Sequence, residues 1–408
     1  MRGGMRVGIG LAVMVAVLFM ALFTVASCAA QPERLVVLTP QAAEVLRILG
    51  AEDKIVGISS TVLGYGREAF FPELAGMPQV GSFYNPDVEK IVELEPDVVV
   101  EYTWAAQYLE ESLTPFGIEV WRYDFYEPQT LLGEIEEFAS RLGSEYEAAA
   151  QEYVRFAEEK MEEVESVVSG IPEDERPRVF IEGGPYGQYY TTNNSGWAVC
   201  VEWAGGENVA ADIVGEGGHA GAWLDPEWVV DRDPEVFIKV SWWHMPGGYG
   251  TDDPFALKEF RDEIAARPEL ETVSAIVNDR IYVITFDMLL SPSYFAGVAQ
   301  LAKWLHPEAA ASLKPRQWHK EYLERFHNLG YLGVHTYPLL LGDANVDDVV
   351  SIRDAQWIAK YDVGLIGDDE IDEVAADVSG DRRVTITDAM LVAKYIVGLI
   401  EEFPVEAA

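Results

Sequence analysis

Cysteine is nearly absent from this chain, since only Cys28 and Cys200 occur among its 408 residues. No framework of disulfides can therefore stabilise the fold. Basic residues are scarce as well: 29 Lys and Arg face 69 Asp and Glu, which leaves a formal net charge of -40. Because contacts to nucleic-acid phosphates need clustered Lys and Arg, this balance argues against a nucleic-acid partner.

Recognisable catalytic motifs are also missing. The sequence holds no G-x-S-x-G elbow, no Walker loop and no G-x-G-x-x-G that opens a helix after a strand. Cys200 lies among apolar neighbours in "GWAVCVEWAG" and is interpreted as a buried core thiol rather than a nucleophile. Hydrophobic residues make up 49% of the chain, as in a globular protein, and its length suffices for two or three domains. The sequence therefore predicts a protein that is not an enzyme.

A targeting segment occupies residues 1–28. Arg2 and Arg6 precede an unbroken apolar run over residues 7–26. The run ends in "VASC", which resembles a lipobox, the site at which a lipoprotein cysteine, here Cys28, is acylated and becomes the mature N-terminus. The run is also long enough to span a bilayer, so an uncleaved membrane anchor is the alternative. Both interpretations place the rest of the chain outside the cytoplasm, anchored to the outer face of the cell membrane.

Short β-branched runs then alternate with amphipathic stretches. Strands are expected at residues 34–38, 54–59, 97–102 and 119–124, with helical spacing of apolar residues between them. This alternation predicts an N-terminal α/β lobe with a largely parallel sheet over residues 33–142.

One long helix is expected next, over residues 143–170. Ser144 and Glu147 have the spacing of a capping box, and Gly170 and Pro172 follow the last turn. At 1.5 Å per residue, twenty-five helical residues of this segment would span about 38 Å, roughly the width of a small domain.

The strand and helix alternation resumes after this helix. Strands are expected at residues 178–183, 236–241 and 280–285, within a C-terminal α/β lobe over 177–329 that a linker at 330–340 follows. The predicted fold class is therefore α/β: two α/β lobes joined by one long helix, plus a small all-α calcium-loop domain described below.

Three phrases of the sequence carry a resemblance to a known family. "RLVVLTPQAAEVLRILGAEDKIVGIS", "MPQVGSFYNPDVEKIVELEPDVVVEY" and "LDPEWVVDRDPEVFIKVS" resemble the solute-binding proteins of iron-chelate and cobalamin ABC importers. The resemblance covers about residues 33 to 328. It implies two lobes joined by a rigid helix, a ligand held in the cleft between them, and an ABC permease as partner.

Aromatic residues are plentiful in the loops expected to face this cleft. In a parallel α/β sheet, ligands lie beyond the carboxyl ends of the strands. Aromatic walls suit a flat or bulky ligand, although each aromatic taken alone could equally be an ordinary core residue. The candidate ligand-binding residues are Tyr84, Trp104, Tyr186, Tyr189, Trp242, Trp243, His244 and Tyr294.

Two scarcities narrow the ligand class. All six histidines lie at or after His219, so the first lobe could not supply imidazoles to a bare zinc or manganese ion. Few cations lie in the expected cleft loops to bind a carboxylate-rich siderophore, and the clearest, Arg67, could be a surface residue. A neutral or metal-centred chelate fits better, with cobalamin ahead of haem or an iron chelate. His219 and His244 could supply an axial ligand, although a lone histidine is more often structural.

The end of the chain contains two copies of one short unit, 34 residues apart. Each copy places oxygen-bearing side chains at positions 1, 3, 5, 9 and 12 of a twelve-residue loop, with position 7 (Val349 or Arg383) offering its backbone carbonyl. This is the ligand spacing of a calcium loop, so two Ca²⁺ ions are predicted. The side-chain ligands are Asp343, Asn345, Asp347, Ser351 and Asp354 in the first copy and Asp377, Ser379, Asp381, Thr385 and Asp388 in the second.

One helix is expected after each loop, and the two helices agree at nine of thirteen positions. A single helix per loop over residues 341–402 resembles a dockerin, the calcium-dependent module that binds cohesin domains. Position 6 departs from the expected glycine, since it holds Asp348 and Arg382. By the resemblance, the residues that would contact a cohesin are Ile352, Arg353, Ile386 and Thr387, with Lys360 and Lys394 further on.

Together these patterns predict an extracytoplasmic solute-binding protein that captures a metal chelate for an ABC importer and carries a calcium-binding tail for surface assembly. One alternative is a cell-surface assembly protein whose lobes have lost their ligand. Another is an enzyme on a related two-lobed scaffold, which the export signal and the missing cofactor motifs disfavour.

Overall fold

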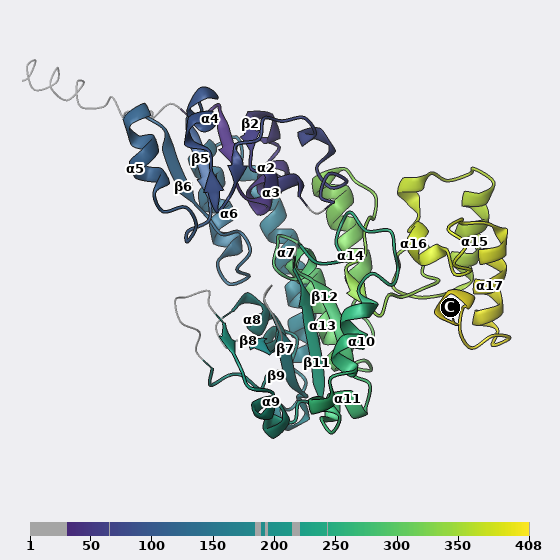
Figure 1. The fold of residues 1–408 in the computed structure, drawn as a ribbon. Helices are drawn as coiled ribbons and strands as arrows, with labels where there is room; N and C mark the ends of the chain where they lie inside the picture. The colour runs from purple at the N-terminus through teal and green to yellow at the C-terminus, as the bar shows by residue number, and fades with distance from the viewer. Residues whose placement is uncertain are drawn as a thin grey trace, which may run out of the picture.

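The computed structural model describes residues 31–64, 66–183, 189–191, 195–213, 221–242 and 244–407. They form two α/β lobes, a long helix that runs along both, and a separate helical unit at the C-terminus (Figure 1). We call residues 31–340 the body and residues 341–407 the tail.

The first lobe is built on a four-stranded parallel sheet. Its strands have the order β2 (Ile55–Ile58), β1 (Leu35–Val37), β5 (Val98–Glu101) and β6 (Glu119–Arg122). All three residues of β1 are fully buried, as expected for a central strand with both faces covered. The covering helices are α2 (Pro40–Leu49), α3 (Ser60–Leu63), α4 (Val88–Glu93), α5 (Leu109–Leu113) and α6 (Leu131–Leu142), and a small hairpin of β3 (Gly81–Ser82) and β4 (Asn85–Pro86) lies between α3 and α4.

The long helix α7 (Glu147–Val168) packs on both lobes. It contacts α2 and α6 of the first lobe and α8 and α13 of the second. Its length of 22 residues corresponds to about 33 Å. The predicted capping box is wrong, because the helix begins at Glu147 after Tyr146 and no side chain caps it. Its buried face, which includes Tyr153, Phe156 and Val164, stabilises the helix instead.

The second lobe has a five-stranded sheet. The strand order is β13 (Thr336–Tyr337), β12 (Ile281–Thr285), β11 (Val236–Ser241), β7 (Arg178–Glu182) and β9 (Glu207–Asn208), and only the edge strand β13 runs antiparallel to its neighbour. Since β13 lies within residues 330–340, part of the segment expected as a linker belongs to this sheet. Around it lie β8 (Tyr190–Thr191), β10 (Ala222–Trp223), α8 (Gly196–Trp203), α9 (Pro226–Arg232), α10 (Lys258–Ala265), α11 (Ser274–Val277), α12 (Phe286–Leu289), α13 (Tyr294–Leu305) and α14 (Pro315–Tyr322), with a π-helical turn at Leu323–His327.

Cys200 is fully buried in α8, and burial raises the pKa of its thiol. This burial supports the interpretation as a core thiol, because a reactive cysteine needs an exposed site that favours the thiolate.

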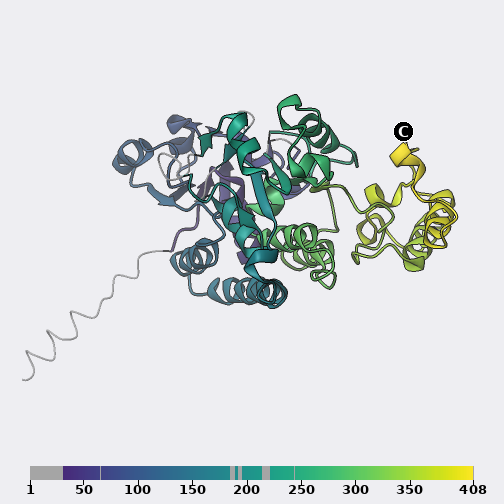
Figure 2. The same ribbon diagram turned by 90° about the horizontal axis from the view of Figure 1, so that it is seen from below.

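The tail has its own small core. Helices α15 (Ile352–Asp362) and α17 (Ile386–Ile396) pack side by side, with the short α16 (Glu373–Ala376) between them in the sequence (Figures 1 and 2). Ile358, Ile371, Val378, Val392 and Phe403 fill the space between these elements. The predicted fold class is thus confirmed. Within the described ranges, no helix is both long and apolar enough to cross a membrane.

Candidate ligand cleft and calcium loops

The carboxyl ends of the strands in both lobes carry aromatic side chains. In the first lobe, Tyr102 and Trp104 follow β5, Tyr126 lies four residues after β6, and Tyr84 lies in the β3–β4 hairpin. In the second lobe, Trp242 follows β11 and Phe286 follows β12 directly. These are the positions where open α/β sheets bind their ligands.

Within the first lobe, the aromatic rings form one connected group. Trp104 stacks on Tyr102, with ring centroids 5.3 Å apart and planes within 7° of each other. The indole N–H of Trp104 donates to the Tyr126 hydroxyl at 2.9 Å. Tyr84 lies 5.8 Å from Trp104, centroid to centroid, and its side chain is 54% exposed. Tyr84 is therefore the member of this group most available to a ligand.

The group continues across the lobe boundary. Tyr126 of the first lobe and Phe286 of the second have centroids 6.0 Å apart. Phe286 lies 5.0 Å from Trp242, and Trp242 lies 5.9 Å from Trp197. Rings from both lobes thus form a continuous array, which we call the aromatic wall: Tyr84, Tyr102, Trp104, Tyr126, Phe286, Trp242 and Trp197.

An ion pair and an aromatic stack join the two lobes beside this wall. The guanidinium of Arg67 donates to the Asp287 carboxylate at 2.5 Å, and both side chains are shielded from solvent. The alternative interpretation of Arg67 as a surface residue is therefore wrong, since the loop after α3 turns it into the lobe boundary. Phe70 stacks on Tyr249 of the second lobe at 4.0 Å.

Two buried carboxyl groups lie at or near the lobe boundary. Glu101, the last residue of β5, is fully buried, and desolvation raises its pKa to about 8. Glu44 on α2 accepts a hydrogen bond from the Tyr322 hydroxyl at 2.6 Å, and desolvation raises its pKa to about 8 as well. Both groups are therefore stabilised in the neutral form.

Several residues predicted to line the cleft do not join the aromatic wall. Tyr189 is buried in the core of the second lobe, where its hydroxyl donates to Glu269 at 2.6 Å. Tyr294 is buried at the start of α13 and packs against Trp203. His244 is exposed. Tyr186, Trp243, His219 and Cys28 lie outside the described residues.

Four residues at this boundary were not among those predicted from the sequence: Tyr126, Phe286 and Trp197 of the wall, and Asp287. Phe286 and Asp287 could have been found, because they directly follow a predicted strand. Tyr126 could have been found as well, because it lies just beyond the strand expected at 119–124. Trp197 could not, because its helix α8 reaches the wall only through the tertiary fold.

The two loops of the tail have closely similar backbones. We call residues 343–354 loop 1 and residues 377–388 loop 2. At position 6, Asp348 and Arg382 both have φ 64°, so the left-handed turn forms without the expected glycine. Each loop ends in an aspartate whose carboxylate accepts two backbone N–H groups: Asp354 from Asn345 and Ser351, and Asp388 from Ser379 and Thr385.

Two α/β lobes bridged by one long helix are the architecture of a two-lobed binding protein. The chain belongs to the periplasmic binding protein family, which it matches over residues 35–288. Residues 341–397 match the dockerin type I domain, so the tail is a dockerin.

Similar proteins agree with this assignment. An ABC transporter substrate-binding lipoprotein of Bacillus subtilis is 23% identical over 284 residues, which are 68% of this chain and 81% of that protein. A cobalamin-binding protein of Halobacterium salinarum is 29% identical over 215 residues, 51% of this chain and 54% of that protein, so the chain spans about half the length of this relative.

A solved structure shows the same fold. The TroA-like periplasmic binding protein FepB of Veillonella parvula has a TM-score of 0.61 and 22% identity, over 76% of this chain and 95% of that one. The family consists of transport components that bind a substrate, and dockerin type I domains typically bind calcium.

The loop residues fit a hard cation such as calcium. The side-chain carbonyl oxygen of Asn345, at position 3 of loop 1, is buried and has no hydrogen-bond partner among the described residues. Within those residues no three His, Cys, Asp or Glu side chains converge on one point. Loop 1 would supply amide, hydroxyl and main-chain oxygens beside its carboxylates, and loop 2 would supply hydroxyl and main-chain oxygens beside its carboxylates. Calcium accepts such mixtures of oxygen ligands.

Proposed function

We propose that this chain captures a metal-chelate ligand, with cobalamin the first candidate, for an ABC importer, and that its dockerin attaches it to a cohesin-bearing partner at the cell surface. The observation that carries the first part is the aromatic wall, in which rings from both lobes lie in one array. A corrinoid or a porphyrin presents a broad, flat surface, and stacked rings bind such surfaces well. The cobalamin-binding relative supports the choice of first candidate.

Capture would need no bond to be made or broken. The lobes would enclose the ligand, and contacts such as the Arg67–Asp287 ion pair would favour the closed arrangement. Exposed Tyr84 and half-buried Trp104 and Trp242 are the side chains we propose as direct ligand contacts.

Localisation follows from the N-terminal segment and the family. We propose that Cys28 is lipidated and anchors the chain on the outer face of the membrane, as the name of the Bacillus subtilis lipoprotein suggests for that relative. Two Ca²⁺ ions would fold the dockerin loops, and the exposed Ile352, Arg353, Ile386 and Thr387 would meet a cohesin.

Ligand-induced melting tests the capture proposal. We expect one of cobalamin, haem or a ferric chelate to raise the melting temperature of residues 31–408, and Tyr84→Ala to weaken that shift. Phe116→Ala is the matched control, because Phe116 is a similarly exposed aromatic of the first lobe, outside the wall. No shift with any ligand, with the fold intact, would favour the assembly protein with empty lobes.

A further inference from the structure

We propose that the body holds the dockerin by loop 1, and that this docking competes with calcium for Asp343. The docking itself follows from contacts between described residues. The competition rests on the proposed calcium binding of the loops.

Arg316, at the start of α14 in the body, makes the central contact. Its guanidinium donates to the carboxylate of Asp343 at 2.7 Å, to the Leu340 carbonyl at 3.2 Å, and to the carboxylate of Asp372. Arg316, Asp343 and Asp372 are all buried. Asp343 is position 1 of loop 1, so a cation of the body neutralises one of the expected calcium ligands.

Four more groups of the body reach loop 1, and one of them, the Lys320 ammonium, donates to the Asn345 carbonyl at 3.5 Å. The Lys314 ammonium donates to the Asp347 carbonyl at 2.9 Å. The Asp348 carboxylate accepts the backbone N–H of Gln317 at 2.9 Å and lies 3.6 Å from the Lys303 ammonium. Loop 1, which is strongly acidic, therefore lies beside cationic side chains of α13 and α14.

Apolar and close backbone contacts extend this interface. Phe255 of the body packs against the core of the tail, and Val374 of the tail packs against a cluster of the body formed by Leu257, Val283 and Val334. At Gly330 a Cβ atom would lie only 2.7 Å from the carbonyl oxygen of Asp369, so the two backbones approach closely there. The docking therefore does not depend on a single ion pair.

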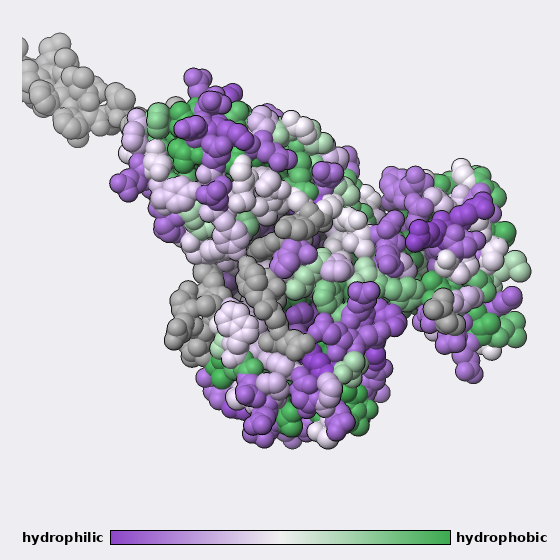
Figure 3. Space-filling view, in the orientation of Figure 1, coloured by the Kyte–Doolittle hydropathy of each residue, from purple (hydrophilic) through white to green (hydrophobic). Residues whose placement is uncertain are grey.

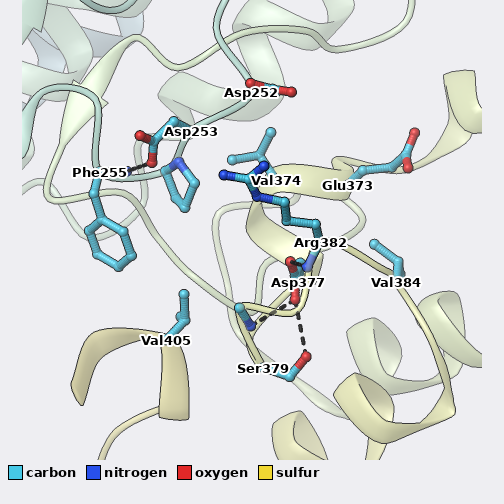
Figure 4. A pocket seen from close by; sticks show the side chains of 12 residues that line it. Asp252, Asp253, Phe255, Glu373, Val374, Asp377, Ser379, Arg382, Val384 and Val405 are labelled. Carbon is cyan, nitrogen blue, oxygen red and sulfur yellow. Dashed lines mark hydrogen bonds between the residues drawn. The ribbon is translucent and has the colours of Figure 1, made fainter. Parts of the chain in front are cut away.

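Loop 2 provides an internal comparison. Among the described residues, no hydrogen bond or ion pair joins the body to loop 2, and Gly380, Asp381 and Arg382 are exposed. A pocket of about 490 Å³ separates the two, with Asp252 and Asp253 on the body side (Figure 4). Position 6 differs accordingly: loop 1 has the buried acid Asp348, whereas loop 2 has Arg382.

This asymmetry gives the two loops different calcium chemistry. Calcium in loop 1 would be a second cation beside the Asp343 carboxylate, which Arg316 already neutralises. The two cations would repel each other strongly, because solvent screens charges little at a buried site. By linkage, calcium in loop 1 must weaken the hold of Arg316 as much as Arg316 weakens calcium. Calcium in loop 2 meets no such cation of the body, so only loop 1 connects calcium to the position of the tail.

Calorimetric calcium titrations of residues 31–408 test the competition, since this segment contains the hydrophobic clusters found among the described residues of the body and the tail. Asp343→Asn and Asp377→Asn assign the binding events to the loops. We expect Arg316→Gln to tighten calcium binding at loop 1 by at least about fivefold, the lower end of typical couplings, and to leave loop 2 unchanged. Arg325→Gln is the matched control, because Arg325 pairs with Glu152 away from the tail.

A second variant controls for disruption of the interface, because Arg316→Gln leaves the buried Asp372 carboxylate without its cation. The double substitution Arg316→Gln with Asp372→Asn keeps the net charge and should show the same tightening at loop 1. Small-angle scattering compares three samples, with the unaltered chain in chelator as the reference. We expect a larger radius of gyration for the double variant and also for the unaltered chain saturated with calcium.

The outcomes separate the two ideas. If neither loop binds calcium in the unaltered chain, the proposed calcium function fails. If both loops bind calcium but the double substitution does not change the calcium affinity of loop 1, the proposed competition is wrong while the proposed calcium binding is supported. If the radius of gyration is the same in all samples, Arg316 does not hold the tail and the docking proposal is overturned.

Discussion

Gly66 of the first lobe and Gly250 of the second touch backbone to backbone. A Cβ atom at Gly250 would lie 2.5 Å from the Cα atom of Gly66, a distance that real Cβ contacts essentially never reach. The lobes meet here because neither residue has a side chain, and the Arg67–Asp287 ion pair lies immediately beside this contact. This boundary and the aromatic wall next to it are the features on which the proposed capture of a ligand depends.

Gly250→Ala should therefore separate the lobes. We expect a larger radius of gyration in small-angle scattering and a stability loss of about 1–3 kcal/mol from overpacking, measured by urea unfolding. Gly133→Ala is the control, because a Cβ there meets nothing within 4 Å and Gly133 lies inside α6. That substitution should stabilise the protein by about 0.5–1 kcal/mol. Equal effects of the two changes would refute the close contact.

Arg67→Met should remove the ion pair between the lobes. Breaking a buried pair leaves Asp287 uncompensated, and such changes cost about 3–5 kcal/mol. Pairing Arg67→Met with Asp287→Leu should recover part of the loss, because no buried charge is then left alone. Arg325→Met, which removes a surface pair with Glu152, should cost no more than about 1 kcal/mol. Losses that simply add in the double variant would show that the two residues act independently.

The free energy of unfolding should fall as the pH rises, because the buried carboxyl group of Glu44 must then ionise. Burial raises its pKa in the folded protein to about 8, above the usual glutamate value of 4.5, so the fold favours the protonated form. That contribution is complete below pH 4.5 and is lost as the pH rises towards 8, by up to about 1.4 kcal/mol per pH unit. Glu44→Gln should make the free energy of unfolding, measured with urea, depend less on pH between pH 5 and 8. Glu93→Gln, at an exposed position of α4, is the control and should leave this dependence unchanged. A slope unchanged by Glu44→Gln would contradict the assignment.

Removing calcium should loosen the tail and spare the lobes. We expect chelator to lower the helical signal in circular dichroism and to raise hydrogen exchange in residues 341–402, more in loop 2 than in loop 1. The carboxylates of loop 2 repel one another without the cation, whereas Arg316 still pairs with Asp343 in loop 1. Exchange in β1, β5 and β11 should stay slow, since these strands are buried in the sheets of the lobes. Exchange in the tail that is the same with and without calcium would count against both loops.

The sequence by itself determined the fold class and the general position of the candidate site. Buried β-branched runs such as 97–102 can form only covered strands, and ligands bind beyond the ends of such strands, so Tyr84, Trp104 and Trp242 could be named from local pattern. The twelve-residue spacing likewise predicted the two loops of the dockerin, because all the expected calcium ligands of a loop lie within one short segment.

Only the tertiary structure decided which side chains meet across elements. It placed Tyr189 in the core of the second lobe, although Tyr189 also lies beyond a strand, since its position depends on packing against Arg267 and Glu269. It brought Arg67 to Asp287 over 220 residues of sequence and Arg316 to loop 1. Such pairings depend on how helices and loops pack in space, and no local periodicity or propensity encodes them.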